Sequence, residues 1–278
     1  MNTRMLKLLA DWFIPPRCQR LYREITFRQA SRLTAHESVM LSRNTKFRNM
    51  YSGRRCFVIG NGPSVNKQDL TALADEVTIA MNWFNKHPII ERWKPTFFCM
   101  AEPPGPTLEV EWLPLMLDRV EAQAYFFRLD VKEIFDNHRF IDPERVYYLK
   151  TDGAPPYGWP ASRQSVDLSR TIPGCPTTAH MAIIIALYLG CSPIYLIGLD
   201  HDWLAQPIVA THFYDSDANL SMFSYKQLME IMLRVWTTHE WIKDVASKQG
   251  VVIYNATDGG FLDVFERADY ESVVGGKC

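Results

Sequence analysis

The segment Gly60-Asn61-Gly62-Pro63-Ser64 combines the residue types that a tight ligand-binding turn requires. Two glycines let the backbone turn sharply and approach a ligand closely, and the proline makes the turn rigid. If a helix follows, the amide groups of its first turn form a site for an anion. The segment is neither a Walker loop nor GxGxxG, and it can also be an ordinary strand–helix turn. We interpret it as a phosphate cradle for a nucleotide-type ligand.

Other polar residues stand directly after apolar runs, where strands of a sheet are expected to end. In open parallel sheets, ligands bind outside the carboxyl ends of the strands. The fold therefore brings such residues together although they are far apart in the sequence. We expect four of them to join the turn in binding a nucleotide, namely Asn82, Glu102, Gly198 and Asp200.

The sequence Asp200-His201-Asp202 invites comparison with the DxD motif of metal-dependent sugar transferases. Two carboxylates can hold Mg²⁺ or Mn²⁺ through their oxygens. Motifs of three residues arise often by chance, however, and the end of a strand commonly carries one Asp. We therefore predict no metal site.

His212 lies in the segment Thr211-His212-Phe213-Tyr214-Asp215, in a polar stretch without periodicity about a dozen residues after the apolar run 194–197. A loop of this length in an α/β domain is often a functional lid. A histidine in such a loop can act as a general base, because its pKa is ordinarily close to neutral. The alternative is a surface histidine without a role. His180, in contrast, lies in an apolar helical segment and is expected to be a core residue.

The elements that must position these residues are apolar strands alternating with helices. This alternation is typical of a parallel sheet covered on both faces. We expect a soluble α/β domain over residues 52–260, with a Rossmann-like, mostly parallel sheet, helices on both faces and a lid loop. The expected strands are 56–59, 77–81, 96–100, 124–127, 146–149, 194–197 and 251–254, and the expected helices are 66–74, 177–189 and 227–248.

Residues 1–50 differ from the catalytic domain predicted for residues 51–278, since they are rich in Arg and Lys and have helix-like apolar spacing around Leu9, Trp12 and Phe13. They form either a basic amphipathic helix on a membrane surface or a helical arm packed on the core or on a second subunit of a homo-oligomer. The short apolar stripe favours the packed arm, and contact of residues 1–16 with the inner face of the plasma membrane is the alternative hypothesis.

Composition narrows the class of protein. The net charge of −1 argues against a nucleic-acid partner, since such domains carry a large basic excess. The six cysteines form no CxxC pair, which indicates a reducing compartment without a zinc site. No apolar run is long enough to span a membrane, and the N-terminus lacks the layout of a signal peptide. We expect a cytoplasmic protein.

Four stretches resemble known families. The segment 54–64 and the run that ends at Asn82 resemble the archaeal 6-hydroxymethylpterin diphosphokinase-like family (domain of unknown function 115). They also resemble the sialyltransferases of glycosyltransferase family 42 and the motility-associated flagellin glycosyltransferases. Segments 176–200 and 255–262 are similar to the second half of these families, and the resemblance covers residues 52–265.

The resemblance implies a metal-independent, cofactor-free glycosyltransferase. It would transfer a nonulosonic, sialic-acid-like sugar from a CMP donor to a surface glycan or glycoprotein. It implies that Asn61, Ser64 and Asn82 hold the phosphate and ribose, and that Thr177 and Thr178 lie near the nucleotide. His212 would be the general base, and Tyr214 would help the phosphate to leave.

One position departs from the resemblance, because the sialyltransferases have Asn where this chain has Glu102 after its third strand. A carboxylate accepts hydrogen bonds from ribose hydroxyls or a cytosine amine but donates none to a phosphate. Two alternatives therefore stay open. One is pyrophosphoryl transfer from ATP with Mg²⁺ held by Asp200 and Asp202. The other is a non-catalytic nucleotide-binding protein, for which His212 is dispensable.

Overall fold

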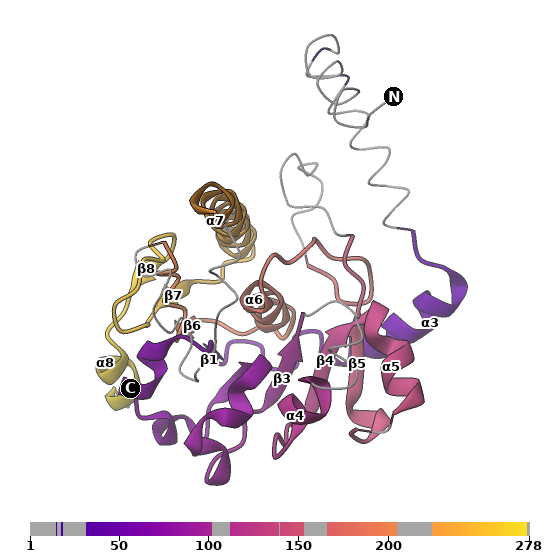
Figure 1. The fold of residues 1–278 in the computed structure, drawn as a ribbon, viewed down its shortest axis with the longest axis horizontal. Coiled ribbons are helices and arrows are strands. Elements are labelled where there is room, and N and C mark those ends of the chain that lie inside the picture. The colour runs from indigo at the N-terminus through magenta and orange to yellow at the C-terminus, as the bar shows by residue number, and fades with distance from the viewer. Residues whose placement is uncertain are drawn as a thin grey trace.

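The structure, a computed structural model, describes residues 15, 18, 32–101, 112–138, 140–152, 166–204 and 224–276. These residues build an eight-stranded sheet with the strand order β5-β4-β3-β2-β1-β6-β7-β8 (Figure 1). Every neighbouring pair of strands is parallel. The strands are β1 (Cys56–Ile59), β2 (Val77–Met81), β3 (Phe97–Met100), β4 (Ala124–Arg128), β5 (Val146–Leu149), β6 (Ile194–Ile197), β7 (Ile253–Asn255) and β8 (Glu266–Arg267).

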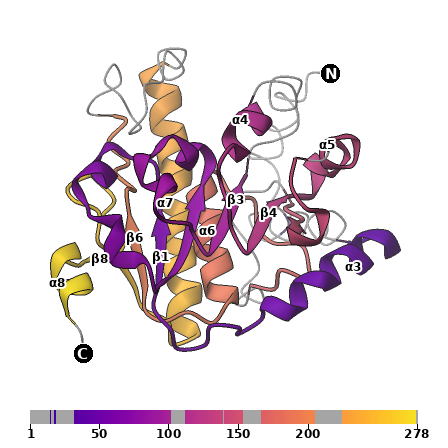
Figure 2. The ribbon, with the colours of Figure 1, turned by 90° about the horizontal axis from the view of Figure 1, so that it is seen from below.

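Helices cover both faces of the sheet (Figures 1 and 2). Side chains alternate along each strand, so that Val58 packs in the core beneath α6 and α7, while Phe57 and Ile59 pack in the core of the opposite face. Helices α3, α4, α5 and α8 contribute to that opposite core. The predicted parallel sheet with helices on both faces is confirmed. The helices are α3 (Ala35–Ser42), α4 (Leu113–Leu117), α5 (Lys132–Asn137), α6 (Thr178–Tyr188), α7 (Tyr225–Lys248) and α8 (Tyr270–Gly275).

Helix α6 lies between the sheet and α7 and is buried at every residue, as its uniformly apolar sequence predicts. Helix α7 is amphipathic and begins at Ser224, whose hydroxyl accepts a hydrogen bond from the backbone of Gln227 while the Gln227 side chain returns one to the backbone of Ser224. This capping box satisfies amide groups that the first turn of a helix leaves unpaired. None of the described helices is both long enough and apolar enough to cross a bilayer.

The prediction of one helix over residues 66–74 is wrong. Two short 3₁₀ helices, η2 (Pro63–Lys67) and η3 (Leu70–Leu73), replace it. Gln68 separates them in an extended conformation, and its side chain donates a hydrogen bond of 2.7 Å to the Ala256 carbonyl. The Asp69 carboxylate then caps η3. Polar side chains that bond to the backbone in this way compete with a continuous helix. The last expected strand also begins later, at Ile253.

The strand order reverses at β1. The chain runs outward through β2, β3, β4 and β5 on one side of β1, then returns to place β6, β7 and β8 on the other side. Such a reversal leaves a crevice at the carboxyl ends of the two central strands, because the connections from these strands leave in opposite directions. The crevice between β1 and β6 is therefore the place where a ligand site is expected.

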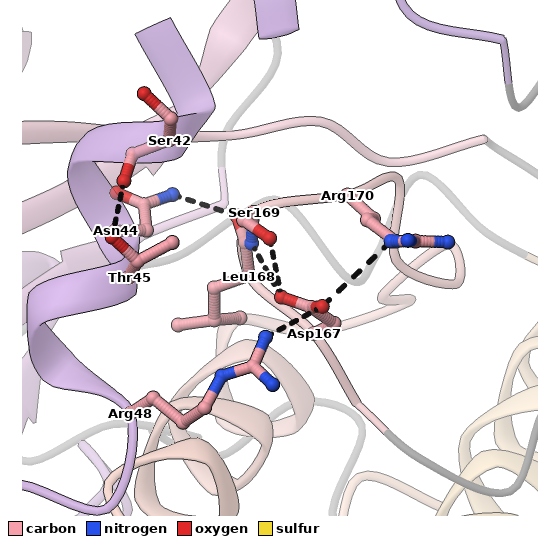
Figure 3. A network of polar contacts seen from close by, with 8 residues as sticks. All are labelled: Ser42, Asn44, Thr45, Arg48, Asp167, Leu168, Ser169 and Arg170. Atoms are coloured by element: carbon pink, nitrogen blue, oxygen red, sulfur yellow. Dashed lines mark hydrogen bonds and ion pairs between the residues drawn. The ribbon is translucent and has the colours of Figure 1, made fainter. Parts of the chain in front are cut away.

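Residues 32–50 pack against this domain. The Asn44 side chain donates a 2.7 Å hydrogen bond to the Leu168 carbonyl, and Arg48 forms a 2.7 Å ion pair with Asp167 (Figure 3). Burial opposes the charge on Asp167, but hydrogen bonds from Ser169 and Arg48 outweigh it and lower the pKa of this carboxyl. Phe47 enters the core beneath α6. The predicted membrane contact of residues 1–16 and the predicted lid loop lie outside the described residues, except for Pro15.

Candidate functional site

A pocket of about 90 Å³ lies at the carboxyl ends of β1, β2 and β6, in the crevice where the strand order reverses. All predicted nucleotide-binding residues line it except Pro63, Ser64 and Glu102. Ser64 contacts a lining residue, whereas Glu102, His212 and Tyr214 lie outside the described residues. The pocket is lined by Gly60, Asn61, Gly62, Met81, Asn82, Thr177, Thr178, Ala179, Gly198, Leu199, Asp200, His201 and Trp203.

The glycine turn is built to meet the end of β6. The Gly60 amide donates a 2.8 Å hydrogen bond to the Ile197 carbonyl, and the Gly62 amide donates one of 2.8 Å to the Gly198 carbonyl. These bonds continue the pairing of β1 with β6 beyond the strands. A Cβ atom on Gly62 would stand 1.6 Å from the Asp200 carboxylate oxygen Oδ2. Gly62 itself has φ −65°, which any residue adopts. Glycine is required here for close approach to Asp200 and not for an unusual backbone angle.

Asp200 supplies negative charge at this turn. The Ser64 hydroxyl donates a 2.8 Å hydrogen bond to Asp200 Oδ2, and the Ser64 backbone amide also favours the ionised carboxyl. Burial is the largest effect and raises the pKa of Asp200, and the neighbouring charge of Asp202 raises it further. The side chain is only 8% exposed. The expected amide cradle is thus occupied by the protein's own carboxylate, and no α-helix follows the turn to strengthen it.

Two asparagines bring polar side chains to the pocket, and one of them has a buried atom without a hydrogen-bond partner among the described residues. Asn61 Nδ2 donates to the Met81 carbonyl at 3.1 Å, while its buried Oδ1 accepts no hydrogen bond from the described residues. Asn82 adopts a left-handed backbone with φ +49°, and its Oδ1 accepts a 3.1 Å hydrogen bond from Thr178. Buried polar atoms without a partner in a native protein call for an explanation, and a ligand is one. Asn61 offers an acceptor and the Asn82 amide a donor.

Three buried histidines form a cluster at the pocket, and one of them, His201, lines it. His201 Nε2 and His239 Nε2 share a hydrogen bond of 3.0 Å, and the rings of His239 and His180 are 4.2 Å apart. His180 Nδ1 accepts from the backbone of Thr177, so His180 Nε2 donates to the Val235 carbonyl. Burial lowers the pKa of His180 to about 3 and that of His201 to about 4, and it lowers the pKa of His239 well below the usual value. The cluster is neutral at physiological pH.

The sequence identified His180 as a core residue, which is confirmed, but it missed the cluster. His201 and His239 are 38 positions apart and belong to different elements, so no local spacing links them. Among the described residues, no group of three or more His, Cys, Asp or Glu side chains is arranged to hold a metal ion.

Comparison with known families agrees with this geometry. The model of the family described as 6-hydroxymethylpterin diphosphokinase MptE-like matches residues 32–206. The chain belongs to this family. The match confirms the resemblance seen in the glycine turn, and it extends from α3 through the whole pocket. It begins at residue 32, so the packed segment 32–50 is part of the MptE-like sequence pattern.

The fold of this MptE-like chain is similar to that of the MAf glycosyltransferase from Magnetospirillum magneticum AMB-1, with a TM-score of 0.51 and 16% sequence identity. The similarity covers 85% of this chain but only 38% of that protein, so the present chain corresponds to less than half of its structural relative. No curated protein sequence matches the chain. At this level of identity the comparison establishes the α/β fold and leaves the activity to be argued from the site.

Proposed function

We propose that the protein is a glycosyltransferase that binds a nucleotide-activated sugar in the pocket at the ends of β1, β2 and β6. One observation carries the proposal. Polar groups from three strand ends converge where the strand order reverses, in a fold shared with a glycosyltransferase. The convergence includes a buried acceptor on Asn61 and a carboxylate on Asp200, which are groups suited to a polar ligand.

The polarity of the pocket indicates how a donor is held. Asn61 Oδ1 and the Asp200 carboxylate accept hydrogen bonds, so they suit the hydroxyls of a ribose or the amino group of a cytosine. The Asn82 side-chain amide, whose oxygen accepts a hydrogen bond from Thr178, offers a donor for the phosphate, which the charge of Asp200 repels. This arrangement supports a CMP-activated donor, and the sequence resemblance supports a nonulosonic acid as its sugar.

The reaction requires one proton transfer and one departing phosphate. A general base removes the proton of the acceptor hydroxyl, whose oxygen attacks the anomeric carbon, and the bond between that carbon and the phosphate oxygen breaks. We propose His212 as the base and Tyr214 as a donor to the departing phosphate. A hydrogen bond from the Asn82 side-chain amide, whose oxygen is held by the Thr178 hydroxyl, then stabilises the negative charge of the leaving CMP without a metal.

Ligand-induced stabilisation tests the nucleotide. A ligand that binds only the folded protein at 100 times its Kd stabilises it by about 2.7 kcal/mol. We expect CMP and CDP to raise the melting temperature equally with Mg²⁺ and with EDTA, and UDP, GDP and ATP to have smaller effects. A shift with ATP and Mg²⁺ but none with CMP would contradict the proposal.

Substitution tests the base. His212→Ala should lower kcat by about 10²–10⁴-fold, since a positioned base contributes about that much, and should leave the Kd of CMP unchanged. The activity of the unsubstituted enzyme should fall as the pH drops below about 6.5. His201 is unsuitable as a control because it lines the pocket, whereas His36 is exposed on α3. Equal activity of His212→Ala and His36→Ala would show that another group removes the proton.

The second candidate is pyrophosphoryl transfer from ATP, which the family description favours. It requires Mg²⁺, for which the candidate ligands are Asp200, which lines the pocket, and Asp202, whose charge acts on Asp200. Under this candidate, EDTA abolishes ligand-induced stabilisation and Asp202→Asn weakens it. Under the glycosyltransferase proposal, neither treatment changes the effect of CMP.

A further inference from the structure

A second and larger cavity, of about 370 Å³, lies beside the nucleotide pocket. It lies between the ends of β3 and β4 and the helices α6 and α7, and Ala101, Arg128, Met181 and Arg234 are among its lining residues. The two spaces are neighbours, because Pro176 lines the larger cavity while the next two residues line the pocket. The volume lies within the range of ordinary ligand sites, about 300–1,000 Å³. The pocket alone is too small for a nucleotide sugar.

Two arginines line this cavity, and none of its described lining residues is a carboxylate. Asp130 pairs with Arg128, and Asp152 accepts a hydrogen bond from the Gly174 amide, so the charge that remains to be paired is that of Arg234. Among the described residues, the side chain of Arg234 makes one hydrogen bond, from Nε to the Glu230 carbonyl at 3.4 Å within its own helix, and no described carboxylate forms an ion pair with it. Its guanidinium charge is therefore not neutralised by the described part of the protein.

Arg128 is fixed in place. Asp130 accepts hydrogen bonds from Nε, at 3.0 Å, and from Nη2 of this arginine. Its remaining nitrogen, Nη1, lies 3.5 Å from the Ala101 carbonyl, which is the outer limit of a hydrogen bond. Asp130 thus holds the guanidinium in one orientation and leaves donors of Nη1 for a ligand. A pre-oriented donor loses less entropy on binding than a free side chain does.

The lining also includes a cysteine. Burial raises the pKa of the Cys175 thiol to about 12, so this thiol stays protonated at neutral pH. Met181 and Ile231 add apolar surface opposite the guanidinium groups. Arginine recognises planar anions by paired hydrogen bonds, and carboxylate geometry matches its donors. The combination suits a ring with a carboxylate substituent.

We propose that this cavity is a subsite for a carboxylate-bearing sugar, whose carboxylate is held by Arg234 and Arg128. The inference deepens the proposed function and rests on it, because a nucleotide in the neighbouring pocket makes this cavity the place of a sugar. The carboxylate belongs either to the sugar of the donor or to the acceptor glycan. The chemistry of recognition is the same in both cases.

Calorimetric titration of the full chain with free N-acetylneuraminate and with its methyl ester tests the subsite. The ester removes only the charge. We expect the acid to bind at least about 10-fold more tightly than the ester, and Arg234→Gln to weaken binding of the acid by about 10–100-fold, because a hydrogen bond to a charged group is lost. Arg234→Lys should recover part of the affinity, since it restores charge without the fork.

Lys248→Gln is the matched control. It removes one positive charge from the same helix, where Lys248 pairs with Asp244 at 2.6 Å, and the affinity for the acid should not change. Equal binding of acid and ester, or equal losses in Arg234→Gln and Lys248→Gln, would overturn the subsite. Binding of the acid must also exceed that of inorganic phosphate, because the reverse order would mean a phosphate site and would overturn the assignment.

Competition separates the two sources of the carboxylate and the two proposals. If a CMP-linked acidic sugar displaces the free acid, the cavity holds the donor sugar. If both bind together, it holds an acidic acceptor. CMP affinity should be equal in the parent and Arg234→Gln. If CMP fails to bind while the Arg234-dependent affinity for the acid persists, the proposed nucleotide donor is wrong and the carboxylate subsite stands.

Discussion

Gly62→Ala is the most direct test of the contact between the glycine turn and the end of β6. The new Cβ atom would stand 1.6 Å from Asp200 Oδ2 and 2.8 Å from the Gly198 carbonyl oxygen. If Asp200 stays, the overpacking costs about 1–3 kcal/mol. If it moves, it loses its hydrogen bond from Ser64, which costs about 1.5–3 kcal/mol because the acceptor is charged.

The protein takes the less costly of the two routes, so we expect the free energy of unfolding to fall by about 1–3 kcal/mol. For a chain of this size, each kcal/mol lowers the melting temperature by about 2–4 °C, which predicts a decrease of about 2–12 °C. Differential scanning calorimetry measures it. Gly275→Ala is the matched control, since nothing lies within 4 Å of a Cβ atom there, and its stability should change by less than about 0.5 kcal/mol.

A double-mutant cycle identifies the clashing group. Asp200→Ala removes the nearest atoms, so that the closest neighbour of the new Cβ is the Gly198 oxygen at 2.8 Å. The destabilisation by Gly62→Ala should therefore be smaller by about 1 kcal/mol or more in the Asp200→Ala background. Additive effects of the two substitutions, or a Gly62→Ala protein that melts with the parent, would refute the contact.

Three further outcomes are expected. Burial raises the pKa of Asp200, so the ionised carboxylate lowers the free energy of unfolding at neutral pH. Asp200→Asn should therefore raise the free energy of unfolding at pH 7, as measured by urea titration. This gain should shrink as the pH falls towards about 4. Burial keeps the three histidines neutral, and the stability that goes with their neutral form is present above about pH 6.5 and is lost as the pH falls to about 4, the pKa of His201. His239→Phe removes one of these groups. It should therefore reduce the slope of the free energy of unfolding against pH, on the acid side, by up to about 1.4 kcal/mol per pH unit. Deletion of residues 1–16 should reduce sedimentation with anionic vesicles, and equal pelleting of both chains would rule out that membrane contact.

The sequence predicts most of the sheet, because buried parallel strands are continuous apolar runs bounded by turns. The runs 56–59 and 194–197 match β1 and β6 residue for residue, and the helix expected over 177–189 is found at Thr178–Tyr188. The error at 66–74 has a tertiary cause. Gln68 is held extended by the Ala256 carbonyl, 188 positions away, and no local pattern contains that contact.

Many of the residues that line the pocket could be predicted from the sequence, whereas what each of them contacts could not. A residue such as Asn82 follows an apolar run, so its place at a strand end can be read from the sequence. The sequence does not give the strand order, and only the order shows that β1 and β6 are neighbours. The reason for a glycine at position 62 depends on the pairing of β1 with β6, since the side chain that lies against Gly62 is that of Asp200, just after β6. Arg128 and Arg234 were missed for the same reason, as they share a cavity without sharing any spacing.

The distribution of charge around the two cavities orients an anionic ligand. Two unit charges 4 Å apart interact by about 4 kcal/mol at the effective dielectric constant of a protein surface, so a phosphate placed against the Asp200 carboxylate would be repelled by a comparable amount. The histidines of the cluster are neutral and offset none of this repulsion. A positive charge without an ion pair to a described carboxylate lies at Arg234 in the larger, neighbouring cavity. Under the proposed function, a nucleotide would therefore place its hydroxyl or amino groups against Asp200 and its phosphate away from that carboxylate, with the attached sugar in the cavity of the arginines.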